Sequence, residues 1–464
     1  MSFSRQWRWD RTAIIAVVVA VFAFHQRPVC AQSPPGPPQA VQVSIEGPLT
    51  LDEAIGIALA HQPVLSIARR NVKAAAGATR QTRSQFLPSL TFRSDYSRSM
   101  SEGATVIDGV PVGETSRRFA TQYRTSFRFD QLIFDFGRTA DEYRRSRLQK
   151  RVTEHQLDQT EDDVINAVQQ AFLALLTNQE LLDVAQDQLR FQEGTAEWTR
   201  AHFEAGRIPM ADVARAESAR ATAQLDVTAS ENAVALSRVA LNEVMGIDVR
   251  TQYEMAPLPE PEPTELTLDG LIAVAMGRRP EVLGAQKQLG AAEARLRAAR
   301  KGHVPSITGG ASFGWREPEF HPSLKYWSVS VGLNLNIFDG WFTEAQEQQA
   351  AADRGAARDA VYETIERVAT ETAQSFLDLG TAAQQIQAAQ AAVDSGDEAL
   401  RLANGRYRAG VGILLEVLDA QAALTFARAD LARARFDHAS ARYGLGRAIG
   451  VPLAELGESA GDTE

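Results

Sequence analysis

The sequence predicts a mixed α/β membrane protein that is internally duplicated, with β-strands for a membrane barrel and long helices for a coiled coil. Three observations predict this fold class. Segments of the first half recur in the second half in the same order, each half has two stretches of alternating apolar and polar residues, and each half has one very long helical stretch. Each copy is therefore expected to form the same set of elements.

The duplication is visible in short matching segments that keep their order along the chain. The offset between the copies changes between Pro88 and Phe134, so the first copy is longer there. We predict a first repeat over 49–248 and a second repeat over 266–450. The matching pairs are Leu49–Asp52 and Leu266–Asp269, Pro63 and Pro280, Pro88–Ser89 and Pro305–Ser306, Phe134–Asp135 and Phe338–Asp339, and Phe203–Gly206 and Tyr407–Gly410.

Residues 1–31 predict a secretory signal peptide. Basic residues precede the apolar run Ala13–Phe24, and the small residues around Val29–Ala31 suit cleavage. A membrane anchor is the alternative, but the apolar run is shorter than the roughly 20 residues that span a hydrocarbon core. Lipidation of Cys30 is another alternative, although the residues before it fit a lipoprotein box poorly. No later stretch is long and apolar enough for a spanning helix, so an exported chain is either soluble or an outer-membrane β-barrel.

The composition argues against several classes of function. The net charge is −10, which argues against a nucleic-acid partner. The single cysteine lies within the predicted signal peptide, so we expect no disulfide. The seven histidines form no HExxH motif and no pair at ligand spacing, so we expect neither a metal site nor a cofactor. No nucleophile constellation stands out, and we expect no catalytic residues and no enzyme activity.

Proline marks the ends of several segments. We predict an extended linker over 32–48, a Pro-rich linker between the repeats over 249–265, and a C-terminal tail over 451–464. A short capped helix precedes Pro63, and a second helix over Pro63–Phe86 ends before Pro88, because proline lacks an amide donor and restricts the residue before it.

Alternating residues predict strands at about 89–101 and 119–134 in the first copy, joined by a Gly-rich segment, and at about 306–316 and 326–338 in the second. A soluble sheet packed on one face is the simpler alternative. A membrane barrel is favoured because the strands reach the 9–11 residues that span a bilayer and because their apolar faces are rich in aromatic residues. The residues that we expect to face lipid are Phe127, Phe129, Trp327, Val329, Val331 and Leu333.

Four strands cannot close a barrel, and an open sheet edge is not tolerated in lipid. Several chains must therefore contribute strands to one barrel.

Each strand pair is followed by a long helix and a return helix. The first copy predicts helices at about 136–204 and 209–246, and the second copy at about 340–408 and 413–449. Apolar residues recur with the period of 3.5 residues that is typical of a coiled coil. At 1.5 Å per residue, each long helix is about 100 Å in length. The strand loops are thus expected at one end of the molecule and both helical turns at the other.

Several short segments carry a resemblance to a known family, namely Leu87–Ser89, Val304–Ser306, Phe134–Gly137, Phe338–Gly340, Gly206–Pro209 with Asp212–Val213, Arg406–Gly410 and Leu415–Gln421. In this order and spacing, these segments resemble the TolC-like outer membrane efflux proteins, the outer membrane factor family, over nearly all of the mature chain. The resemblance implies a homotrimer with one 12-stranded outer-membrane barrel, four strands per chain, continued by a helical tunnel through the periplasm. It also implies a periplasmic adaptor protein and an inner-membrane pump of the RND, ABC or MFS type as partners.

The resemblance also implies functional residues near the helical turns. Glu416, Asp419 and Tyr407 match a channel constriction, in which acidic rings select cations or gate flow. The chain departs from better-known members, since Glu replaces Asp at 416 and Gly412 stands where an Arg takes part in the closed state. The simpler alternatives are acids that complement a helix dipole and a tyrosine that packs between helices. Residues that match the adaptor-docking tips are Gly206, Arg207, Ile208, Ala409, Gly410 and Val411.

The resulting prediction is a passive outer-membrane conduit of a tripartite efflux system with a large periplasmic extension. The outer-membrane channel of type I protein secretion is an alternative, and a soluble periplasmic coiled-coil scaffold is an alternative of a different class. An exported enzyme is a further hypothesis, but the sequence shows no catalytic site for it.

Overall fold

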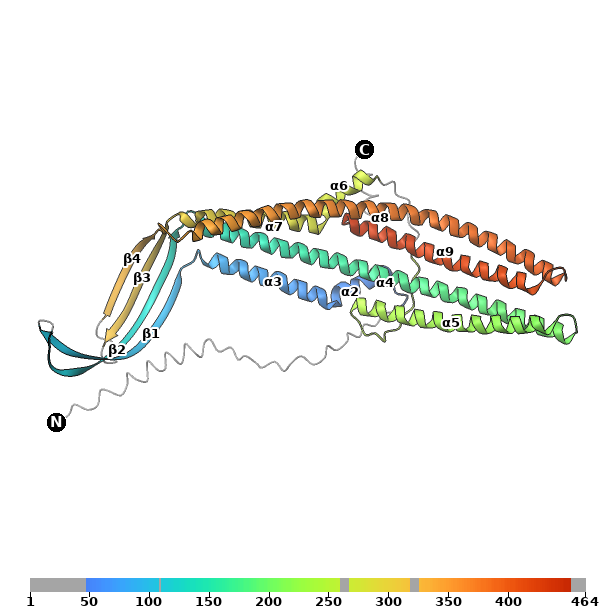
Figure 1. Cartoon of the computed structure of the whole chain (residues 1–464), viewed down its shortest axis with the longest axis horizontal. Helices are drawn as coiled ribbons and strands as arrows, with labels where there is room; N and C mark the ends of the chain where they lie inside the picture. The colour runs from blue at the N-terminus through green and yellow to red at the C-terminus, as the bar shows by residue number, and fades with distance from the viewer. Residues whose placement is uncertain (1–46, 108–109, 259–266, 318–324, 452–464) are drawn as a thin grey trace.

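The computed structural model describes residues 47–107, 110–258, 267–317 and 325–451. These residues form an elongated body with a sheet at one end and two helical hairpin turns at the other (Figure 1). The predicted signal peptide over 1–31 and nearly all of the predicted linker over 32–48 and tail over 451–464 lie outside the described residues.

The two copies contain the same sequence of elements. The first copy contains α2 (Leu51–His61), α3 (Pro63–Ser84), β1 (Ser89–Ile107), β2 (Val110–Phe134), α4 (Arg138–Glu204) and α5 (Met210–Met245). The second contains α6 (Leu268–Arg278), α7 (Pro280–Arg300), the 3-10 turn η1 (Lys301–His303), β3 (Ser306–Glu317), β4 (Lys325–Asn334), α8 (Phe342–Arg408) and α9 (Leu414–Ile449).

The expected lengths of the first two strands are wrong. The segment 103–118, interpreted from the sequence as a Gly-rich loop, pairs as the far end of the β1–β2 hairpin, up to Ile107 opposite Val110. The ladder shifts register near Gly103. Backbone pairing does not require apolar alternation, which is why the side-chain pattern did not predict this extension.

The expected end of the last strand is also wrong. β4 ends at Asn334, whereas the alternation of Leu335 and Ile337 extended the prediction to 338. Asn334 pairs with Ser306, the first residue of β3, and the residue before it is Pro305, which has no amide hydrogen to donate. The ladder therefore has no partner for the residues after Asn334.

The short first helix of each copy begins at the repeated Leu-Thr-Leu-Asp segment. In α2 a capping box forms, because Thr50 accepts from the Glu53 amide at 3.3 Å and Glu53 accepts from the Thr50 amide at 3.1 Å. In α6 the equivalent third residue is Gly270, and Thr267 makes no such bond. Pro63 and Pro280 each start the next helix at the position where proline is tolerated.

The junction from sheet to long helix is built in the same way in both copies. Asp135 accepts from the Thr139 amide at 2.7 Å, and Asp339 accepts from the Thr343 amide at 3.2 Å. Two consecutive residues in each copy adopt positive φ, and one of each pair is not glycine: Phe136 (57°) and Trp341 (68°). The aspartate caps supply bonds that hold these strained turns.

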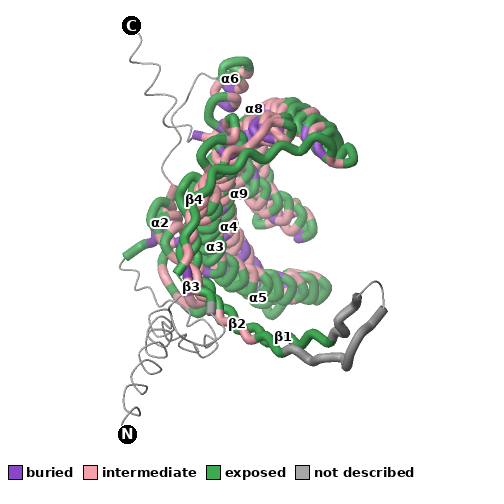
Figure 2. The backbone as a smooth tube through the Cα atoms, turned by 90° about the vertical axis from the view of Figure 1, so that its left-hand side faces the viewer, coloured by how far each residue is buried: buried purple, intermediate pink, exposed green. Residues whose placement is uncertain are grey.

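The sheet is antiparallel, with strand order β1-β2-β3-β4, so that the second copy continues the sheet of the first. Next to the sheet along the long axis, α3, α4, α7 and α8 lie side by side in that order and form a curved layer, with α2 on its convex side (Figures 1 and 2).

The apolar cores lie at mid-length, where the short helices pack on the long ones. Burial of these side chains removes apolar surface from water and fixes the helices to one another. Core residues of the first copy include Ala54, Ala58, Val168, Phe172, Leu241 and Met245. Core residues of the second copy include Leu271, Ala275, Val282, Val368, Leu445 and Ile449.

Candidate functional site

The predicted lipid-facing residues form one continuous apolar face across the four strands. Phe127 of β2 lies opposite Phe92 of β1 and Phe313 of β3, and Phe313 lies opposite Trp327 of β4. The rings of Phe92 and Phe127 are 5.1 Å apart. A second row joins Phe129 to Val329 through Ala311. Paired residues of an antiparallel ladder point to the same side, so these rows share a face.

No described element covers this face. The side chains of β4 show this most clearly: Trp327 is 74% exposed, Val331 72% and Leu333 69%. Phe127, Phe129 and Val329 are also exposed. An uncovered apolar face of this extent marks a surface that contacts lipid or a partner.

The opposite face of the sheet is polar. Arg128 pairs with Asp130 at 2.9 Å, and the hydroxyls of Ser312 and Ser328 are 2.8 Å apart. One face is thus suited to an apolar environment and the other to water, which is the alternation of a barrel that encloses an aqueous lumen.

The outer edges of β1 and β4 have no strand neighbour among the described residues. Unpaired edges next to an apolar face are a liability for a single chain, because their backbone amides and carbonyls require partners.

In both copies, the long helix that leads into the turn at the far end of the molecule ends with the same hydrogen-bonded motif. Gly206 donates to the Phe203 carbonyl at 2.8 Å, and Arg207 donates to the His202 carbonyl at 2.9 Å. In the second copy, Gly410 donates to the Tyr407 carbonyl and Val411 to the Arg406 carbonyl, each at 3.0 Å. Both glycines have positive φ (70° and 75°), as the Schellman motif requires. Glycine at both positions thus permits the left-handed backbone that each turn requires.

The turns present a mixed surface. Gly206, Arg207, Ala409 and Gly410 are exposed and Ile208 is half-buried. Val411 is exposed, as are its apolar neighbours Ile413 and Leu415 and, in the first copy, Met210. The two turns lie together at one end of the body, where a single partner could contact both (Figure 1).

The two predicted acids differ in their surroundings. Glu416 is half-buried and lies 3.7 Å from Arg406 of the preceding helix, whereas Asp419 is exposed on the next turn of α9. Arg406 thus supplies a cation near the turn. The resemblance led us to expect an arginine where this chain has Gly412.

Tyr407 packs between the two helical hairpins. Its ring lies 5.0 Å from the Trp198 ring of α4, and it contacts the small cluster of Ala196, Ala216 and Leu414. Its hydroxyl is buried and has no hydrogen-bond partner among the described residues. Burial, and then the charge of Asp212, raise the pKa of the Tyr407 hydroxyl. The sequence reading of Tyr407 as a residue that packs between helices fits this environment, but it leaves the constriction prediction open.

The sequence analysis did not identify one cluster of charged residues at mid-length. Arg279 is only 4% exposed, and its guanidinium bonds Glu281 at 2.8 Å and Glu371 at 2.9 Å. It also donates to the carbonyls of Arg447 and Ala448 at 3.2 Å, the C-terminal end of α9. Arg279 precedes Pro280 just as Gln62 precedes Pro63 in the first copy. This equivalence is the sequence feature that could have identified Arg279.

The same cluster shifts the pKa of its carboxyl groups. Burial acts to raise the pKa of Glu281, but hydrogen bonds and charge from Arg279 bring it below its ordinary value. Burial, and then the charge of Glu281, raise the pKa of Asp162 on α4 to about 6.

No helix in the described part of the chain is long and apolar enough to cross a membrane. Within the same residues, no group of His, Cys, Asp and Glu is arranged to hold a metal ion.

Comparison with known proteins identifies a family for most of the chain. The family model described as outer membrane efflux protein matches residues 54–247 and 271–451, which are the two structural copies.

Individual relatives and a solved structure agree with the family match. The toluene efflux pump outer membrane protein TtgF of Pseudomonas putida is 28% identical over 418 residues, covering 88% of this chain and 84% of the relative. The pyoverdine export outer membrane protein OpmQ of Pseudomonas putida is 26% identical, covering 86% and 85%. The crystal structure of the Campylobacter jejuni CmeC outer membrane channel superposes with a TM-score of 0.76 at 17% identity, covering 86% of this chain and 85% of CmeC, and shares the fold.

Proposed function

The chain belongs to the outer membrane efflux protein family, and we propose that three copies of it form one passive conduit through the outer membrane and the periplasm. As a member of this family it is an outer-membrane component of an efflux system with a helical periplasmic extension. The proposal concerns how the chain assembles, which partners it meets and which residues act.

The uncovered apolar face of the sheet is the observation that carries the proposal. Val331 and Leu333 remain about 70% exposed in the single chain, next to two open strand edges. Pairing β4 of one copy with β1 of the next removes both edges and turns the apolar face toward lipid. Three copies then supply twelve strands, an even number within the range of outer-membrane barrels.

The two turns at the far end are proposed to dock a periplasmic adaptor protein, which couples the conduit to an inner-membrane pump. Their exposed backbone and small residues permit a helical partner to approach closely. The docking residues are Gly206, Arg207, Ile208, Ala409, Gly410 and Val411.

A ring of acidic residues is proposed to line the narrow end of the tunnel. Glu416 and Asp419 lie three residues apart near the start of α9, so threefold repetition would place six carboxylates around one opening. Tyr407 supports this end by packing the hairpins against each other.

The transported substrate and the pump are not specified by these residues. Relatives are named for toluene efflux and for pyoverdine export, so the family architecture accepts chemically different cargo. Export of a polypeptide by a type I system would use the same conduit. A soluble scaffold is disfavoured, because the apolar sheet face would then lie in water.

The proposal is tested by single-channel recording of the purified particle in planar bilayers. The wild-type particle is expected to conduct, and Glu416→Ala with Asp419→Ala is expected to raise conductance or to reduce cation preference. The matched control is Asp430→Ala with Asp437→Ala, which removes the same charge from exposed positions farther along α9. Absence of conductance in the wild type would contradict the conduit, whereas equal effects in both variants would remove the acidic ring alone.

A further inference from the structure

A strongly basic cavity of about 740 Å3 lies between α4 and α7, close to the sheet. Its charged lining comes from Arg144, Arg147 and Arg151 of α4 and from Lys287 of α7, with His155 at one end. No aspartate or glutamate is among the described residues that line it. The whole chain carries a net charge of −10, so this local excess of cations has the opposite sign to the net charge of the chain.

Most of these cations are not neutralised by the protein. Arg144 and Lys287 have no ion pair with a described carboxylate, and the described contact of Arg147 is with the Tyr143 ring, at 5.9 Å. Arg151 shares Glu154 with another cation. Cations gathered without counter-charges repel one another, so an anion that enters the cavity would relieve this repulsion.

Three acids of α4 near the cavity are already engaged, and one of them, Asp158, lies 3.2 Å from His155. Asp141, in the turn before Arg144, is bonded to Lys301 at 2.6 Å and to Arg297 at 3.1 Å. Glu142 lies 3.4 Å from Arg145. Asp141 and Glu142 therefore do not balance Arg144, Arg147 or Lys287.

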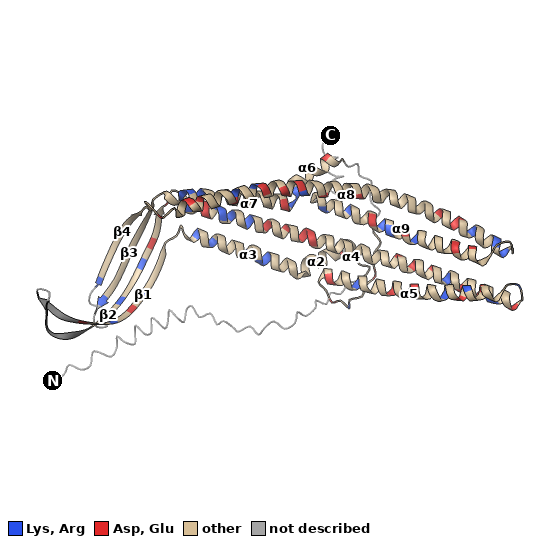
Figure 3. Ribbon diagram, in the orientation of Figure 1, with Lys and Arg blue, Asp and Glu red and all other residues tan. Residues whose placement is uncertain are grey.

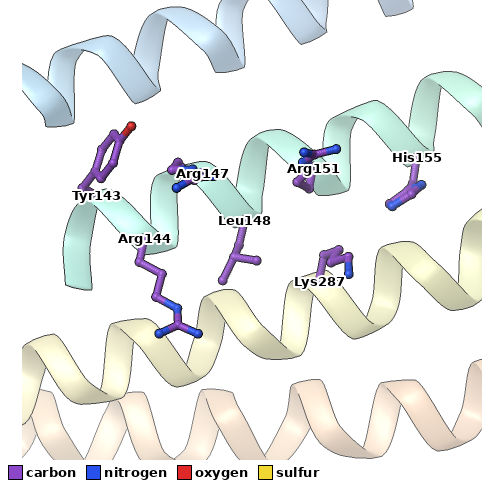
Figure 4. A pocket seen from close by; sticks show the side chains of 7 residues that line it. All are labelled: Tyr143, Arg144, Arg147, Leu148, Arg151, His155 and Lys287. Carbon is purple, nitrogen blue, oxygen red and sulfur yellow. The ribbon is translucent and has the colours of Figure 1, made fainter. Parts of the chain in front are cut away.

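The two walls of the cavity are held at a short separation. A Cβ at Gly290 of α7 would meet a Leu148 methyl at 3.4 Å, and a Cβ at Gly284 would meet the His155 Cβ at 3.6 Å. Lys287 of α7 lies between these two contacts, and Arg144 of α4 extends toward α7 on the other side of Leu148 (Figure 4). Guanidinium and ammonium groups that line one cavity both suit the oxygens of a phosphate.

The cavity opens on the convex side of the helical layer. Arg147 precedes Val168 by three heptads, so both residues point to the same side of α4. Val168 packs in the core that includes Ala54 and Ala58 of α2, and α2 lies on the convex side (Figure 2). In a closed tunnel the convex side faces away from the lumen.

The cavity also lies close to a group of exposed aromatic residues at the junction of sheet and helices. At 1.5 Å per residue, Arg144 is about 9 Å along α4 from Arg138 and Arg151 about 20 Å. Basic side chains gather at this end of the helices (Figure 3). Exposed aromatic residues mark the interface of a membrane and snorkelling cations reach its headgroups. The exposed aromatic residues here are Phe86, Phe134, Phe136, Phe338, Trp341 and Phe342.

We propose that this cavity binds a phosphate-bearing anion, supplied either by the headgroup of an anionic phospholipid in the inner leaflet or by a soluble phosphate. The lipid source rests on the proposed placement of the sheet in the membrane, whereas the phosphate chemistry does not. Arg144, Arg147 and Lys287 hold the phosphate oxygens, and the cavity acts separately in each copy because both walls belong to one chain.

The test compares wild-type particles with the variant Arg144→Gln and Arg147→Gln. The matched control is Arg354→Gln with Arg358→Gln on α8, which removes the same charge from exposed positions and also disturbs an arginine on a tyrosine ring. Native mass spectrometry of particles from nanodiscs that contain phosphatidylethanolamine and phosphatidylglycerol measures the retained lipid. Calorimetric titration with glycerol phosphate at constant ionic strength measures soluble binding.

Retention of phosphatidylglycerol that falls about tenfold in the cavity variant, and less than about twofold in the control, supports the lipid source. Glycerol phosphate binding that is lost in the same pattern, without selective lipid retention, supports the soluble source. Equal behaviour of wild type, cavity variant and control overturns the proposal. If the glutamine variant does not assemble, Arg144→Lys with Arg147→Lys keeps the charge and is expected to weaken binding several-fold. A wild-type particle that still conducts and still contains three chains separates failure here from failure of the proposed conduit.

Discussion

Gln62 and Arg279 occupy the same position in the two copies and perform the same task with different side chains. Gln62 donates to the carbonyls of Glu243 and Val244 at the end of α5, as Arg279 does at the end of α9. Each closes the C-terminal carbonyls of a long helix, which otherwise lack partners. Arg279 also forms ion pairs with two carboxylates. We therefore expect the stability of the second copy to depend more on Arg279 than the stability of the first copy depends on Gln62.

Replacement Arg279→Ala is expected to lower the free energy of unfolding by about 3 kcal/mol, because Glu281 then remains half-buried without its cation. Urea unfolding followed by circular dichroism measures this loss. The matched control is Arg278→Ala at the exposed neighbouring position, expected to stay within about 0.5 kcal/mol. Equal losses in both variants would show that the buried cluster contributes nothing specific.

Asp162 is expected to make stability depend on pH. Its pKa of about 6 in the folded chain lies above the ordinary value of 3.8, through burial and then the charge of Glu281. Between these two values the folded state holds a proton that the unfolded state has released, so the free energy of unfolding falls as pH rises. The loss continues as pH rises through about 6 and is nearly complete about one pH unit higher.

Asp162→Asn is therefore expected to stabilise the protein at pH 7.5, by about 1 kcal/mol after allowing for the partial exposure of this carboxyl. The gain should be smaller at pH 4. Unfolding curves at both pH values test this, with Asp183→Asn on the exposed face of α4 as the control. A gain that is the same at both pH values would assign the effect to packing instead.

At the scale of elements, the long helices follow from local signals. α4, α5, α8 and α9 begin and end close to the bounds that the sequence indicates, because glycine and proline at the turns act within a few residues. The end of β4 could not be predicted in this way, since the start of β3 sets it through pairing. The basic cavity was likewise inaccessible, because Arg144 and Lys287 come from different copies and meet only after α4 packs on α7.

The two faces of β4 are expected to respond oppositely to charge. Val331→Asp with Leu333→Asp places carboxylates on the apolar face, each costing about 2 kcal/mol in lipid, and should abolish assembly in the outer membrane. Ser328→Asp with Ser330→Asp on the polar face of the same strand should be tolerated. The measurement is the amount of assembled particle extracted from outer membranes. Tolerance of both pairs would mean that this face does not contact lipid.

At the scale of the molecule, the helical part and the sheet of the described chain differ in how completely their surfaces are paired. The helical half is held by its own cores, whereas the sheet leaves an apolar face and two edges without partners among the described residues. The duplication explains why four strands are present, and the curvature of the helical layer is that of a wall segment rather than a closed tube (Figure 2). Additional copies of the same chain supply matching edges without any new sequence.

The native mass of the particle, extracted from outer membranes in mild detergent and corrected for bound detergent, tests this assembly most directly. Three copies of the chain are expected, with four strands contributed by each. A detergent-free monomer or dimer in the soluble fraction would contradict the shared barrel and favour the scaffold instead.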